Sequence, residues 1–72
     1  MTTIRRIDPV RRMARFYALS VQPDLLAGWS VLREWGRIGR AGRARIDAHA
    51  DLADAEAAAQ LLEIRKRRQG YC

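Results

Sequence analysis

Residues 29–43 read WSVLREWGRIGRAGR and predict a strand that ends in a tight turn. From Trp29 to about Gly36, aromatic and branched side chains alternate with other residues, a pattern typical of a half-buried strand. Glycines then recur every third residue, at Gly36, Gly39 and Gly42. Glycine tolerates φ > 0 and close approach by another chain, so this spacing predicts an exposed hairpin connection.

Two further strands are expected on either side of this stretch. Residues 15–22 alternate in the same way, and the turn that follows begins at Pro23-Asp24 and closes at Gly28. Residues 43–49 can form a third strand, although they are rich in alanine, which is a poor strand former.

The chain has 72 residues, which is enough for one domain with a thin core. Residues 1–14 are rich in arginine and are interrupted at Asp8-Pro9, which disfavours a regular element. We therefore expect a basic, partly ordered N-terminal arm over residues 1–14, with Ile4 and Ile7 as its possible anchors, and a folded domain over residues 15–72.

A helix is predicted from Asp51 to Arg68. Asp51 is a good N-cap and Asp54 stands three residues later, an acidic variant of the capping box. Gly70 is the expected stop, and basic residues fill the last turn, where they favour the helix dipole. The predicted apolar stripe consists of Leu52, Ala55, Ala58, Ala59, Leu61 and Leu62.

The charge is positive and unevenly distributed. Lys and Arg number 14 against 8 acids, for a net charge of +6, and Lys66 is the only lysine. Residues 1–46 carry ten arginines and three acids, residues 47–64 carry five acids and no Lys or Arg, and residues 65–68 are all basic. A GC-rich genome could explain Arg over Lys, but it does not explain the surplus of positive charge. Such a basic face attracts polyanions, with release of their counterions.

The expected binding site is the hairpin. Trp35 is interpreted as a platform that stacks on a base or sugar, although it could instead pack beside Trp29, which we assign to the core. Glycine N–H groups and arginines around it would hold phosphates, unless those arginines form only a solvated polar face. The candidate nucleic-acid-binding residues are Trp35, Gly36, Arg37, Gly39, Arg40, Arg43, Arg33 and Arg45.

Catalysis, cofactors and metals are not expected. His49 is the only histidine and has no partner at metal-ligand or triad spacing, and no Gly-Lys-Ser/Thr follows the glycines. Cys72 is the only cysteine, and we expect it to be incidental on a mobile chain end. The sequence shows no membrane span and no signal peptide, which predicts a cytoplasmic protein, with association with the nucleoid as an option.

The ordered motifs resemble those of the WGR domain family. They run from Arg15-Phe16-Tyr17-Ala18-Leu19 through Trp29 to Arg33-Glu34-Trp35-Gly36-Arg37-Ile38-Gly39, then to the helix start and Gly70-Tyr71. The resemblance implies an α+β fold, a small antiparallel sheet of three to four strands with one C-terminal α-helix packed across it. In poly(ADP-ribose) polymerases this domain contacts DNA ends; by matching position, Trp35 would stack on a terminal sugar and Arg37 would touch neighbouring domains.

This chain lacks a polymerase region and zinc-finger neighbours, so it is more similar to short stand-alone bacterial WGR proteins, and the Arg37 contact is not expected to transfer. The leading hypothesis is a monomeric, non-catalytic module that binds DNA ends, nicks or junctions, with DNA favoured over RNA. The alternative is a protein-interaction module that recognises an acidic partner and binds nucleic acid only nonspecifically.

Overall fold

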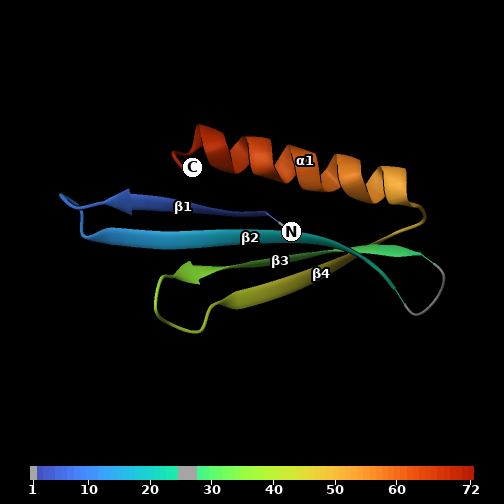
Figure 1. Cartoon of the computed structure of the whole chain (residues 1–72), viewed down its shortest axis with the longest axis horizontal. Helices are drawn as coiled ribbons and strands as arrows, with labels where there is room; N and C mark the ends of the chain where they lie inside the picture. The colour runs from blue at the N-terminus through green and yellow to red at the C-terminus, as the bar shows by residue number, and fades with distance from the viewer. Residues whose placement is uncertain (1, 25–27) are drawn as a thin grey trace.

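A computed structural model describes residues 2–24 and 28–72 of the chain. Four strands form one antiparallel sheet in the order β1-β2-β3-β4, and one helix lies across a single face of it (Figure 1). This arrangement confirms the predicted α+β fold. The elements are β1 (Thr2–Asp8), β2 (Met13–Pro23), β3 (Trp29–Arg37), β4 (Arg43–His49) and α1 (Leu52–Arg68).

The first strand lies where the sequence predicted a partly ordered arm. Residues 2–8 pair in continuous register with β2, from Thr2 opposite Leu19 to Asp8 opposite Met13. Ile4 stands opposite Tyr17 and is only 2% exposed, so the strand is anchored by burial of Ile4 in the core cluster as well as by its hydrogen bonds. The expected anchor Ile7 points to the other face and is 66% exposed.

The connections at the two ends of β3 differ in construction. Before it, the amide of Asp24 donates to the Gly28 carbonyl at 3.0 Å, and the Gly28 amide donates to the Asp24 carboxylate at 2.9 Å. The predicted turn begins and closes at these two residues, while its positions 25–27 lie outside the described residues. After β3, the backbones of Gly36 and Gly42 approach so closely that a Cβ on Gly36 would lie 2.8 Å from the Gly42 Cα.

Helix α1 begins and ends as predicted. The Asp51 side chain accepts a hydrogen bond of 2.8 Å from the Asp54 amide, and Gly70 follows the helix with φ +97°. The predicted apolar stripe is only partly correct, because Leu52 and Leu61 are exposed. Leu61 lies about 100° around the helix axis from Leu62, so it turns away from the sheet. The side chains that do face the sheet are Ala55, Ala58, Ala59 and Leu62.

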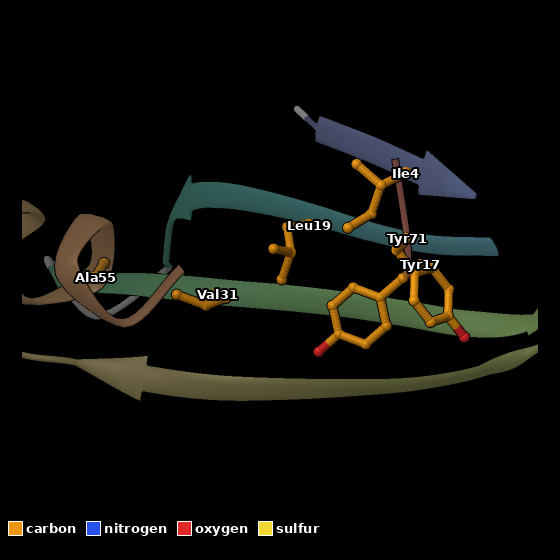
Figure 2. Close-up of a cluster of buried hydrophobic side chains, with 6 residues drawn as sticks. All are labelled: Ile4, Tyr17, Leu19, Val31, Ala55 and Tyr71. Atoms are coloured by element: carbon orange, nitrogen blue, oxygen red, sulfur yellow. The ribbon is translucent and has the colours of Figure 1, made fainter. Parts of the chain in front are cut away.

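The core is a narrow layer between α1 and one face of the sheet. Figure 2 shows its buried members, Ile4, Tyr17, Leu19, Val31, Ala55 and Tyr71. Small alanines let the helix lie close to the strands, so little side-chain volume is needed to fill the layer. Trp29 and Trp35 pack against this cluster and remain partly exposed, which places both indoles at its margin.

The C-terminal residues are joined to the outer edge of β1. The Cys72 amide donates to the Arg5 carbonyl at 2.8 Å, and the Arg5 amide donates to the Cys72 carbonyl at 2.9 Å. Tyr71 is buried just before this contact. The expectation of a loose chain end at Cys72 is therefore wrong for its backbone, because a buried aromatic ring fixes the preceding residue; the thiol itself is exposed.

Candidate nucleic-acid interface

Three basic segments that are far apart in the sequence meet at one end of the molecule. Figure 1 shows the β1–β2 turn, the β3–β4 hairpin and the last turn of α1 at this end, and the start of α1 at the opposite end. The acidic segment that begins α1 is thereby separated from most of the arginines. The uneven charge along the sequence thus becomes a charge asymmetry across the fold.

An open cavity of about 640 Å³ lies among these segments. Its wall combines backbone and side chains from both hairpins with the end of the helix. The cationic side chains that line it are Arg11, Arg12, Arg15, Arg37 and Lys66, and the aromatic ones are Trp35 and Tyr71. A cavity with this lining can take an anion that also has a flat, apolar part.

Beside this cavity, three arginines stand in a row across the sheet. Arg6 is opposite Arg15, and Arg15 is opposite Arg37, all on the face that carries the helix. Directly opposed residues have Cβ atoms about 4.5–5.5 Å apart, and like charges in such pairs are destabilising. Among the described residues, no carboxylate forms an ion pair with any of these three, so the row lacks an internal counterion.

A second pair of opposed arginines is neutralised within the protein. Arg33 stands opposite Arg45, and both approach Asp47, with Nε to carboxylate distances of 3.3 Å and 3.1 Å. These two predicted phosphate contacts thus already have an anion beside them. Arg33 and Arg45 differ in this respect from Arg37, which belongs to the row that has no carboxylate partner among the described residues.

The remaining predicted residues lie around the hairpin. Arg43 stands opposite Trp35 on β4, Gly36 lines the cavity, and Arg40 and Gly39 are exposed at the turn. The Arg40 amide donates to the Arg37 carbonyl at 3.1 Å, which closes the turn. The structure therefore brings Trp35, Gly36 and Arg37 together at the cavity and leaves Gly39 and Arg40 at the tip.

Trp35 packs against the core cluster and also lines the cavity. Its ring lies nearly parallel to Tyr17, with centroids 6.4 Å apart, and the Arg33 guanidinium carbon is 6.0 Å from the indole centroid. These contacts fix one part of the indole against the core, while another part lines the cavity. A ring held in this way is ready to stack on a ligand with little loss of conformational entropy.

Lys66 brings a positive charge of the helix into the site. Its Nζ lies 4.8 Å from the Tyr17 centroid and 5.5 Å from the Tyr71 centroid, within range of cation–π attraction. From the sequence alone, the basic helix end is expected to serve the helix dipole. The signal that could have identified Lys66 is its spacing of four residues from Leu62, which places it on the buried stripe.

Four of the five cations at the cavity were not among the predicted site residues: Arg11, Arg12, Arg15 and Lys66. Arg15 could have been found from strand alternation, because it shares a face with Tyr17. Arg12 could not, because it depends on the tight β1–β2 turn. There it adopts φ 53°, an unusual conformation for a residue other than glycine, and its amide donates to the Pro9 carbonyl at 3.3 Å.

Within residues 2–24 and 28–72, no three or more His, Cys, Asp or Glu side chains gather where they could hold a metal ion. No helix in the same ranges has the length and apolar character that crossing a bilayer requires.

Comparison with known proteins agrees with this architecture. The chain is 40% identical over 68 residues to the uncharacterized protein y4dW of Sinorhizobium fredii, an alignment that covers 94% of this chain and 33% of the relative. It therefore spans about a third of that protein's length. No solved structure matches the chain. The WGR domain model matches residues 1–72, which takes in β1 as well as the hairpin, and the chain belongs to the WGR domain family.

Proposed function

We propose that this protein binds DNA at its basic end, as a non-catalytic accessory module that recognises ends, nicks or junctions. WGR family membership suggests a nucleic-acid-binding module, and the preference for DNA over RNA is part of the proposal. In this role the protein acts as a monomer in the cytoplasm or on the nucleoid. Arg15 and Arg37 contact phosphates, and Trp35 packs on a sugar or base.

One observation carries the proposal: no carboxylate of the described residues forms an ion pair with the row Arg6–Arg15–Arg37, and two members of this row, Arg15 and Arg37, line the cavity in which Trp35 is partly exposed. Opposed like charges are unfavourable in the isolated protein, and a polyanion removes that repulsion when it binds. A guanidinium can hold a phosphate through two parallel hydrogen bonds, and nearby cations add counterion release.

The preference for strand ends follows from the position of the indole. Trp35 packs beside Tyr17 and Arg33 and is only partly exposed, so it offers one part of its ring at the surface and is poorly placed for deep insertion between stacked bases. It can reach a sugar or base only where the nucleic acid leaves one exposed, as it does at an end, a nick or a junction. Stacking on an aromatic side chain contributes about 1–3 kcal/mol per base.

Fluorescence anisotropy with labelled DNA of one sequence tests the proposal. The ligands are a blunt duplex, a nicked duplex and a closed circle, with the matching RNA duplex as competitor, at salt concentrations of about 50 and 200 mM. We expect the logarithm of affinity to fall with the logarithm of salt by about 0.9 for each phosphate contacted. Trp35→Ala should weaken binding to ends and nicks more than binding to the circle. Equal affinities of mutant and wild type for the blunt end would remove the stacking role.

A further inference from the structure

A second cavity adjoins the first on the other side of Trp35. It has a volume of about 320 Å³ and lies between β2, β3 and the last turns of α1. Trp35 and Lys66 line both cavities, so the two compartments share these side chains as a common wall. The other residues used below, Arg33, Leu62, Arg65 and Gln69, line only the second compartment.

The second compartment has the same chemical character as the first. It carries three cations, of which Arg33 is paired with Asp47, together with an amide group from Gln69 and apolar surface from Leu62 and two aromatic rings. The lining of neither compartment includes a carboxylate. By contrast, the cavity of about 280 Å³ beside β1 and β2 is lined by Glu56 and Glu63, so cationic lining is a property of this groove and not of every hollow along α1.

Arg33 supplies an unsatisfied donor beside this groove. Its Nε is buried and, within the described part of the chain, donates no hydrogen bond, although it lies 3.3 Å from an Asp47 oxygen. The ion pair offsets the charge but leaves the N–H without a well-aligned acceptor. Buried donors are normally hydrogen-bonded, so this N–H is an exception. Because the Nε is covered by neighbouring atoms, a ligand oxygen in the groove can meet only the exposed part of the Arg33 side chain, which is 21% exposed.

We propose that the two compartments hold consecutive nucleotides of an unpaired strand that passes over Trp35, so that the preferred ligand is a DNA end with a single-stranded tail. This inference rests on the proposed function and specifies its substrate class. Both compartments have volumes in the range of small-molecule sites, about 300–1,000 Å³, so each is large enough to take a nucleotide. Only an unpaired strand can place successive bases beside one ring while its phosphates follow a basic groove.

The path of the strand assigns a separate task to each compartment. Arg15 and Arg37 hold the phosphates nearest the duplex junction in the first compartment. Arg65 and Lys66 hold those of the tail in the second, where Gln69 can bond to a base edge. Arg65 lines only the second compartment and Arg15 only the first, so the two tasks can be separated by substitution.

Anisotropy titration of the full chain with two labelled duplexes tests the inference. One duplex is blunt and the other carries a tail of about four unpaired nucleotides, close to the smallest site of known single-strand binders. We expect wild type to bind the tailed duplex about tenfold more tightly, as stacking of one further base allows. Arg65→Gln should reduce affinity for the tailed duplex by a larger factor than affinity for the blunt one, whereas Arg15→Gln should reduce both.

The matched control is Arg68→Gln, which removes the same charge from the same helix end but lines neither compartment. Equal binding of blunt and tailed duplexes by wild type would overturn the inference, as would identical effects of Arg65→Gln and Arg68→Gln. In either case, retained blunt-end binding that is weakened by Arg15→Gln would still support the proposed function. If wild type binds neither duplex, the proposed function fails and the inference fails with it.

Discussion

Arg15 stands directly opposite Arg37 on the neighbouring strand, and in the described part of the chain no carboxylate forms an ion pair with either. Arg6 extends the row on the other side of Arg15. The sheet thus contains a repulsive arrangement that a polar, uncharged residue at any of the three positions would relieve. An arrangement that costs stability in the free protein is expected where binding requires it.

The first prediction is that Arg15→Gln stabilises the protein and weakens nucleic-acid binding. Removing the central charge eliminates two repulsive pairs, each of which costs roughly 0.2–1 kcal/mol. Loss of one phosphate contact should make the slope of the logarithm of affinity against the logarithm of salt concentration shallower by about 1. Urea denaturation and anisotropy at several salt concentrations measure the two effects on the same sample.

Arg5→Gln is the control for this experiment. Arg5 lies on the opposite face of β1 and stands across from Phe16, so no cross-strand arginine repels it. It should leave stability nearly unchanged and affect binding less. If Arg15→Gln lowers stability by more than Arg5→Gln, the row is not strained in the free protein.

The second prediction concerns Asp47, which neutralises Arg33 and Arg45. Asp47→Asn should increase affinity for DNA and steepen its salt dependence, because the guanidinium groups of Arg33 and Arg45 become available to phosphates. Its stability should fall, because the opposed pair Arg33–Arg45 loses its counterion. Glu34→Gln makes the same charge change on the opposite face of β3 and controls for net charge. An increase in affinity that is no larger than that of Glu34→Gln would show that Asp47 does not restrict the binding surface.

Most of the fold could be predicted from local patterns. The strand at residues 43–49 and the helix cap at Asp51 occur as predicted, because alternation and capping depend on residues close in sequence. Strand β1 was harder to foresee, since Ile4 is buried only through contacts that are distant along the chain. Leu61 was predicted to lie in the core but is exposed. The part of the helix that meets the sheet is set by the close approach of the alanines, and sequence periodicity does not reveal this approach.

The site could be predicted only around its aromatic residue. Trp35, Gly36 and Arg37 form part of the cavity because they are adjacent on one strand. The cations that complete it depend on strand register and on where α1 ends over the sheet, so Arg15 and Lys66 required the tertiary structure. Likewise, the pairing of Arg33 with Asp47 follows from the register of β3 and β4, and composition could not distinguish Arg33 from Arg37.

The third prediction separates charge from backbone strain at Arg12. Its φ of 53° destabilises the folded state by roughly 1–2 kcal/mol for any residue with a Cβ. Glycine avoids this strain, but its greater conformational freedom in the unfolded state offsets part of the gain in stability. Arg12→Gly should therefore keep or increase stability by up to about 1 kcal/mol, whereas Arg12→Ala should not increase it. Both should weaken DNA binding equally, because both remove a cation from the cavity. Thermal denaturation together with anisotropy distinguishes the effects, and unequal binding losses would mean that turn geometry matters more than charge.

The fourth prediction compares two glycines of the β3–β4 hairpin. A Cβ on Gly42 would lie 2.2 Å from the Trp35 carbonyl oxygen, whereas one on Gly39 would meet no atom within 4 Å. Gly42→Ala should therefore displace the end of β3 and lower both stability, by about 1–3 kcal/mol, and DNA affinity. Gly39→Ala keeps its N–H and should lower only stability, because φ +87° is unfavourable for alanine. Tryptophan fluorescence of the folded variants reports the displacement of Trp35, and an unchanged spectrum and affinity for Gly42→Ala would show that the hairpin does not position this indole.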